Sequence, residues 1–245
     1  GIVGGGKNKG PKTPVVGERV SILNTERDAE ADPALATVPV ILPAPYANSE
    51  WTQPGGNAAK LIGHVALSAS PSQAWGTSIS GSTSKARLAA APVIADGKLY
   101  AIDADAKVIA MNAETGSRLW QTQMPAEGNG RSRFGGGVSV QGDKVYVTTG
   151  VGDVAALDAA NGSIVWKKAP GGPLRGSPTL AQGLVYVMSQ DNQIFALDQN
   201  SGETQWSESG TLQSTGVFGV AAPAAAQGTV IAGFSSGELT TYRYE

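Results

Sequence analysis

Short apolar runs separated by glycine turns recur along this chain from about residue 91 onward. Each unit opens with a strand of small residues, such as Gly137-Val138-Ser139-Val140, and a glycine turn leads into a more apolar strand, such as Lys144-Val145-Tyr146-Val147. The turn glycines stand at positions 97, 142, 183 and 228, which are 45, 41 and 45 residues apart. A repeat of this length with strand-like content predicts a stacked or radial β architecture.

The second half of each unit carries a motif of Asp or Asn, then Gly four residues later, then Trp eight residues later. Its copies are residues 112–120, 158–166 and 198–206, and their tryptophans are 46 and 40 residues apart. Each unit therefore holds four strands in about 40 residues, which is the size of one propeller blade. The predicted fold class is an all-β propeller of four-stranded antiparallel blades.

The glycines and tryptophans of this motif have a structural interpretation. Glycine suits the tight turn because it takes a positive φ without a Cβ clash. A Trp on the outermost strand can cover the apolar gap between adjacent blades with its large ring. We predict this role, in preference to a ligand-binding one, for the repeat residues Trp75, Trp120, Trp166, Trp206, Gly116, Gly162 and Gly202.

Composition narrows the functional classes. The formal net charge is −2, which gives no electrostatic basis for a nucleic-acid partner. The chain has no cysteine, so a disulfide framework and a thiolate metal site within it are excluded. The chain contains no run of about 18 apolar residues, so the sequence predicts no membrane-spanning helix.

The composition also divides the chain. Residues 1–47 are rich in Gly, Lys and Pro at their start and predict a flexible tether and linker. Residues 48–245 predict an incomplete propeller, with blades at about 88–124, 135–169, 175–209 and 220–245. The fourth repeat is cut short and known propellers use about four to eight blades, so we expect an amino-terminal part of a longer protein.

The repeats resemble the PQQ-like propeller repeat, and within that group the BamB family of outer-membrane assembly lipoproteins. The resemblance rests on Ala74-Trp75, on Gly135 to Val140, on Leu174 to Trp206, and on Leu239 to Glu245. It implies a ring of eight blades on the periplasmic face of the outer membrane of a Gram-negative bacterium. It also implies a lipidated cysteine just before Gly1, and this lipid would be the protein's only attachment to the membrane.

The implied function is a non-enzymatic scaffold that docks on the periplasmic domains of the β-barrel insertase BamA and contacts other members of the assembly complex. Unfolded outer-membrane proteins are a further implied class of partner. In the family, the partner-binding surface includes a Leu-x-Leu-Arg-Gly loop that enters the fourth blade, and the matching stretch here is residues 215–219. The candidate partner-binding residues are Leu212, Thr215, Val217, Phe218 and Gly219.

The loop of this chain differs from the family's loop sequence at two positions, and these two residues also have a purely structural interpretation. Val217 replaces the second Leu and Phe218 replaces the Arg, so an apolar contact could persist where a guanidinium contact could not. Ordinary packing between blades would explain Val217 and Phe218 equally well.

A rival function is that of a quinoprotein dehydrogenase-related propeller, which would bind pyrroloquinoline quinone and Ca²⁺. The carboxylates of this chain are mostly turn residues, among them Asp96, Asp103, Asp105, Asp143, Asp158, Asp191 and Asp198. The single histidine, His64, is interpreted as a surface or packing residue and not as part of a Ser-His-Asp arrangement. We therefore expect no enzyme activity, no metal and no cofactor.

Overall fold

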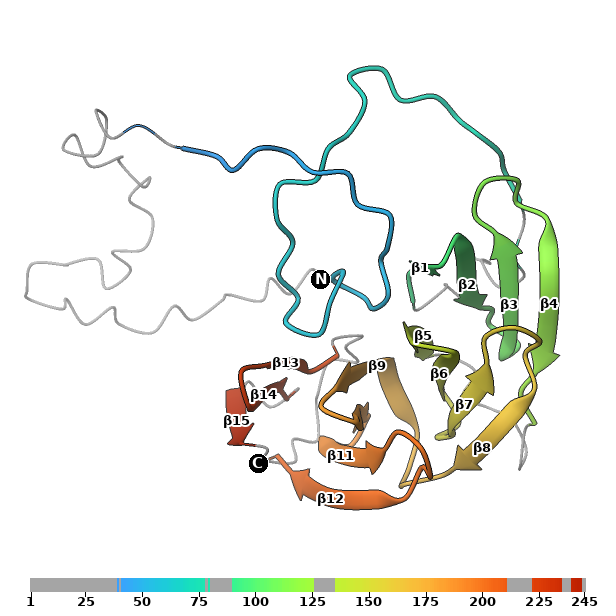
Figure 1. The fold of residues 1–245 in the computed structure, drawn as a ribbon. Coiled ribbons are helices and arrows are strands. Elements are labelled where there is room, and N and C mark those ends of the chain that lie inside the picture. Colours follow the sequence, from blue (N-terminus) through green and yellow to red (C-terminus); the bar gives the residue numbers. More distant parts are fainter. Residues whose placement is uncertain are drawn as a thin grey trace, which may run out of the picture. The chain divides into compact units, whose positions relative to one another are not determined.

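The computed structural model describes residues 39, 41–77, 79, 90–125, 135–210, 222–234 and 239–243. The chain divides into two compact units, residues 1–42 and residues 43–245. In the second unit, the described strands form separate antiparallel sheets whose neighbours follow one another in chain order (Figure 1). The described residues contain no helix.

Three sheets have four strands each and one has three, and we name them blades one to four. Blade one consists of β1 (Val93–Ala95), β2 (Lys98–Ile102), β3 (Lys107–Asn112) and β4 (Arg118–Gln123). Blade two consists of β5 (Gly136–Gln141), β6 (Lys144–Thr149), β7 (Val154–Asp158) and β8 (Ile164–Lys168). Blade three consists of β9 (Leu174–Ala181), β10 (Leu184–Ser189), β11 (Gln193–Asp198) and β12 (Thr204–Ser209). Blade four consists of β13 (Ala224–Ala226), β14 (Thr229–Gly233) and β15 (Leu239–Arg243). The predicted all-β fold with four-stranded antiparallel blades is confirmed.

The inner strands β5, β9 and β13 carry Gly, Ser, Thr and Ala at positions where neighbouring blades approach closely. A β-carbon on Gly137 of β5 would lie 1.8 Å from Oγ of Ser177 on β9, so only glycine fits. Side-chain hydroxyls bridge the same gaps: Ser139 donates to the Pro178 carbonyl at 2.5 Å. Pro178 is tolerated within β9 because β9 is an edge strand of its sheet and needs no ladder donor on that side.

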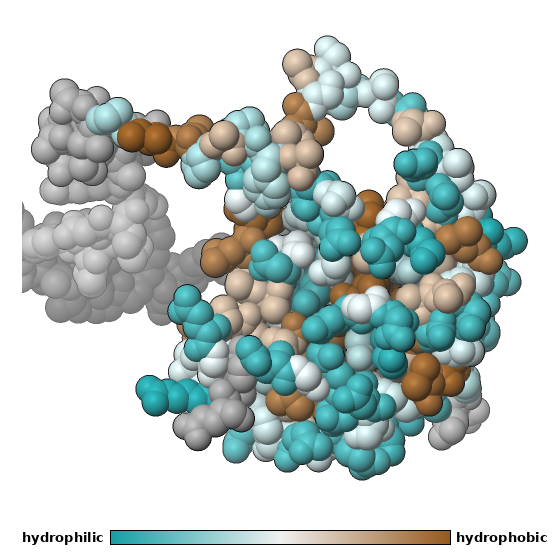
Figure 2. All heavy atoms as spheres, viewed as in Figure 1, coloured by the Kyte–Doolittle hydropathy of each residue, from teal (hydrophilic) through white to brown (hydrophobic). Residues whose placement is uncertain are grey.

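Three apolar clusters lie between successive blades. Val108, Val145 and Leu157 belong to the cluster between blades one and two. Leu197 belongs to the cluster between blades two and three. Tyr186, on the other face of blade three, belongs to the cluster shared with blade four. The middle strands are buried on both faces, whereas hydrophilic residues cover much of the blades in the face shown in Figure 2. Burial of this kind supplies most of the stability of a β architecture.

The sequence of residues 74–79 resembles an outermost strand, but its described residues, 74–77 and 79, are in no strand. A strand needs a hydrogen-bonded neighbour, and no described strand pairs with this stretch. Only the side chain of Trp75 behaves like its counterparts in the repeat, because its Nε1 donates to the Ala113 carbonyl at 2.9 Å.

Candidate functional site

The predicted partner-binding residues lie in a segment that joins blade three to blade four. Residues 211–221, and therefore Leu212, Thr215, Val217, Phe218 and Gly219, lie outside the described residues. What the structure describes are the two ends of this segment, and both are fixed.

The amino-terminal end is held at Gly210, whose backbone amide donates to the Asn192 carbonyl at 2.8 Å. A β-carbon on Gly210 would lie 2.6 Å from the ring of Phe234 in blade four, so the backbone runs directly over that ring. The carboxy-terminal end is held at Pro223, whose carbonyl accepts from Oγ1 of Thr179 at 2.5 Å. Blades three and four thus clamp both ends of the connecting segment.

The tryptophans of the repeat connect each blade to the next. Trp120 on β4 donates through Nε1 to the Ala159 carbonyl of blade two at 3.0 Å. Its ring lies on Gly162, where a β-carbon would be 2.4 Å from the indole, and Gly162 has φ of +77°. Glycine is therefore required there twice, by its backbone conformation and by the approach of the ring. Trp206 of blade three packs on Tyr242 of blade four, with ring centroids 5.5 Å apart.

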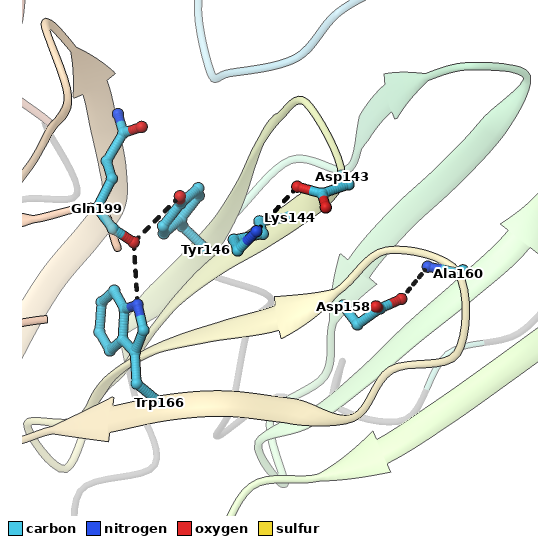
Figure 3. A network of polar contacts seen from close by, with 7 residues as sticks. All are labelled: Asp143, Lys144, Tyr146, Asp158, Ala160, Trp166 and Gln199. Atoms are coloured by element: carbon cyan, nitrogen blue, oxygen red, sulfur yellow. Dashed lines mark hydrogen bonds and ion pairs between the residues drawn. The ribbon is translucent and has the colours of Figure 1, made fainter. Parts of the chain in front are cut away.

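The junction between blades two and three shows the arrangement in full (Figure 3). Trp166 and Tyr146 of blade two both point at the backbone carbonyl of Gln199 in blade three. The indole Nε1 donates at 3.0 Å and the phenol donates at 3.3 Å. Because a carbonyl has two lone pairs, a single buried acceptor takes both bonds.

The electrostatics of this junction keep the phenol protonated. Burial raises the pKa of Tyr146 to about 12, and the charges of Asp143 and Asp198 add to the shift. The pKa of Tyr100, the corresponding residue of blade one, is raised for the same principal reason. Both side chains therefore remain hydrogen-bond donors at neutral pH.

The carboxylates of the Trp motif organise their own turns. Asp158 accepts from the backbone amide of Ala160 at 2.7 Å, as Figure 3 also shows. Asp198 accepts from the amides of Asn200 and Ser201 at 3.0 and 2.8 Å. Its hydrogen bonds with Ser201 lower the pKa of Asp198 below its ordinary value. These groups are acceptors in Asx turns, which is a structural use of a carboxylate.

Other carboxylates are used similarly. Asp103 accepts from the backbone amides of Asp105 and Lys107, both at 2.9 Å. Asp143 pairs with Lys144 at 2.9 Å, and this hydrogen bond lowers the pKa of Asp143. Among the described residues, no three His, Cys, Asp or Glu side chains gather in a way that could hold a metal ion.

His64, the single histidine, is exposed, and its Nδ1 lies 2.7 Å from the Pro43 carbonyl.

In the described part of the chain, no helix has the length and apolar character needed to cross a bilayer.

Sequence reasoning missed three side chains whose polar atoms are buried. Gln53, 6% exposed, forms two hydrogen bonds with the backbone of Leu180, from which it is 127 residues distant. Arg175, also 6% exposed, donates to the Gly233 carbonyl at 3.1 Å. Lys60 has a buried Nζ with no hydrogen-bond partner among the described residues. Gln53 and Lys60 lie ahead of the repeats, so periodicity gave no signal for them, and Arg175 lies in β9 of the third repeat, where no motif marks it.

Comparison with known proteins gives one consistent family. The family described as "Outer membrane protein assembly factor BamB" matches residues 63–132 and 125–245. A relative of that name from Yersinia pestis is 27% identical over 181 residues. That alignment covers 72% of this chain and 46% of the relative, so the chain spans about half the length of the curated relatives that it matches.

Solved structures resemble the fold. BamB from Moraxella catarrhalis has a TM-score of 0.53 and 24% identity, covering 63% of this chain and 49% of that one. Quinohemoprotein alcohol dehydrogenase from Comamonas testosteroni has a TM-score of 0.55 and 25% identity, covering 66% of this chain and 27% of that one. Blades of this type therefore occur both in assembly factors and in enzymes.

Proposed function

This chain belongs to the family of the outer membrane protein assembly factor BamB, and we propose that it is a non-enzymatic scaffold in the assembly of outer-membrane β-barrel proteins. The resemblance predicted from the repeats is thereby confirmed as to family. In our proposal the scaffold docks on the periplasmic domains of the insertase BamA and joins the other members of that complex. The observation that carries the proposal is the family match over residues 63–132 and 125–245.

In the proposed mechanism, the joined blades hold connecting loops in place for a partner to bind. Successive blades are joined by shared apolar clusters and by Trp side chains that donate across each junction. A rigid support of this kind can present connecting loops at fixed positions to a partner. We propose that the segment between Gly210 and Pro223 is such a loop, with Leu212, Thr215, Val217, Phe218 and Gly219 as its contact residues. Its fixed ends support this assignment.

The proposed location is the periplasmic face of the outer membrane, with a lipid anchor ahead of Gly1 and residues 1–47 as the tether. The propeller part would then comprise residues 48–245. Unfolded outer-membrane proteins are further proposed partners, because extended client strands could contact the same loops.

Capture of the insertase from solubilised outer membranes by the full chain tests the proposal. The variant Phe218→Glu should capture markedly less insertase, because it places a charge where an apolar contact is proposed. Leu119→Glu, on β4 and 47% exposed, is the matched control, because it makes the same change in charge at an exposed apolar position. Equal capture by the wild type and both variants would remove the loop from the proposal. Failure of all three chains to capture the insertase would count against the scaffold itself.

A second candidate is a quinoprotein-related enzyme, which the likeness to the quinohemoprotein alcohol dehydrogenase favours. Titration with pyrroloquinoline quinone in the presence of Ca²⁺ tests this alternative. A saturable spectral change of the quinone would support it.

A further inference from the structure

A short segment ahead of blade one, residues Trp51–Ala58, contacts the inner strand of every blade. Its path can be followed in blue beside the inner strands in Figure 1. Each blade receives its own hydrogen bonds: Trp51 with Ile94 of blade one, Thr52 with Val140 of blade two, Gln53 with Leu180 of blade three, and Ala58 with Ala225 of blade four. Eight residues thus link four sheets that extend over more than 130 residues of sequence.

The four contacted residues occupy one equivalent position in the repeat. Within their blades, they stand opposite corresponding residues of the second strand: Ile94 opposite Leu99, Val140 opposite Val145, Leu180 opposite Val185, and Ala225 opposite Val230. The segment therefore contacts the equivalent residue on the inner edge of each blade. Chance contacts of a loop would not be expected to repeat the register of the propeller.

Gln53 takes the place of a backbone peptide at the third blade. Its Nε2 donates to the Leu180 carbonyl at 3.1 Å, and its Oε1 accepts from the Leu180 amide at 2.9 Å. The carboxamide thus forms the same donor and acceptor pair that a neighbouring strand would form. This frees the backbone at Gln53 to turn, and the Gly56 amide donates back to the Gln53 carbonyl at 2.8 Å.

The turn at Gly55 and Gly56 directs the chain from Gln53 toward Ala58 in blade four's vicinity. Gly55 and Gly56 have φ of +83° and +87°, which disfavours other residues. A β-carbon on Gly56 would lie 3.3 Å from the Trp51 ring, so the ring folds over the turn. The turn carries the chain onward to Ala58, whose carbonyl accepts from the Ala225 amide at 2.8 Å.

Four inner-strand amides depend on this segment for the bonds given above. The amides of Ile94, Val140 and Ala225 donate to its backbone carbonyls, at 2.9, 2.8 and 2.8 Å, and the amide of Leu180 donates to Gln53. An inner strand has a free edge, and a buried amide without an acceptor is costly. Loss of the segment would leave these four donors unsatisfied together.

We propose that residues 51–58 form an axial clasp, a conformational device that holds the inner strands of four blades in one arrangement and releases them as one unit. The scaffold role does not require such a clasp. The same contacts could instead open one at a time, each with its own blade. The two behaviours differ in how the four reporter amides exchange with solvent.

Hydrogen exchange by NMR on the full chain tests the clasp. In Gln53→Ala, the amides of Val140, Leu180 and Ala225 should all exchange about tenfold faster or more, although only Leu180 contacts the altered side chain. The matched control is Gln199→Ala, which truncates another buried glutamine whose amide bonds a blade-three carbonyl, that of Leu184, at 3.1 Å. The control should leave these three amides unchanged. Faster exchange confined to Leu180 would overturn the proposal.

A second measurement needs no substitution and holds even if Gln53→Ala does not fold. Exchange of the wild-type chain in low concentrations of denaturant gives an opening free energy for each amide. The clasp predicts one shared opening free energy and one shared denaturant dependence for Ile94, Val140, Leu180 and Ala225. Separate values for each amide would contradict release as one unit.

Discussion

Trp166 of blade two covers Gly202 of blade three so closely that a β-carbon on Gly202 would lie 2.5 Å from Cε3 of the indole. Gly202 also has φ of +72°, so two independent constraints coincide at this residue. The same relationship joins Trp75 to Gly116, where the distance is 2.7 Å. The outer edge of one blade is thereby fitted to a turn of the next.

Replacing Gly202 by Ala should lower the free energy of unfolding by roughly 2–4 kcal/mol, because strain from the positive φ adds to overpacking against the indole. Gly183→Ala separates the two effects: Gly183 has φ of +75°, but a β-carbon there would meet nothing within 4 Å. That control should lose only about 1 kcal/mol. Urea denaturation measures both variants. Equal losses would show that the indole yields to the new methyl group.

The shared carbonyl of Gln199 predicts non-additive substitutions. Trp166→Phe and Tyr146→Phe each remove one of its two described donors. Each should cost about 1 kcal/mol in hydrogen bonding, in addition to any loss of packing. The double variant leaves a buried carbonyl with neither donor and should cost about 1 kcal/mol more than the sum. Additive losses in a double-mutant cycle would refute the shared-acceptor account.

Alkaline pH should weaken the junction between blades two and three. The pKa of Tyr146 rises on folding from 10.0 to about 12, so the folded state holds its phenol proton more tightly than the unfolded state does. This contribution to stability is complete below pH 10 and is lost as the pH rises from 10 through about 12. Urea unfolding at a series of alkaline pH values should show the decline, and Tyr146→Phe should have a shallower one. An equal decline in both proteins would assign the pH dependence to other groups.

Lys60 predicts the opposite pH dependence. Burial lowers the pKa of its amine from 10.5 to about 8, so the unfolded state binds the proton more tightly than the folded state. Stability should therefore rise as the pH increases from 8 to 10.5. Lys60→Met removes a buried charge without a described partner and should raise the free energy of unfolding at pH 7 by about 1–3 kcal/mol. The advantage should vanish above pH 10.5, and a variant less stable than the wild type at pH 7 would contradict this account.

The blades could be predicted from the sequence because each is encoded locally. A glycine turn, an apolar run and a Trp-ending strand recur within about 40 residues, and each of these signals acts on near neighbours in the chain. The turn at Asp158 illustrates this, since its carboxylate bonds an amide only two residues away.

The contacts of Gln53 could not be predicted in this way. Its partner Leu180 is 127 residues away, and the bond uses a side-chain amide in place of a strand. A side-chain amide that takes the place of a strand leaves no periodic signal in the sequence. A Gln followed by Pro and two Gly suggests only a loop. The candidate partner-binding residues stay a prediction, since Leu212, Thr215, Val217, Phe218 and Gly219 lie outside the described part of the chain.

We propose that this chain is a scaffold for the β-barrel insertase. Calorimetric titration of the full chain with the periplasmic domains of BamA from the same bacterium tests it most directly. The account predicts saturable binding with a dissociation constant in the micromolar range or tighter. Absence of binding, together with saturable binding of pyrroloquinoline quinone and Ca²⁺ by the same chain, would contradict the scaffold and support the enzyme.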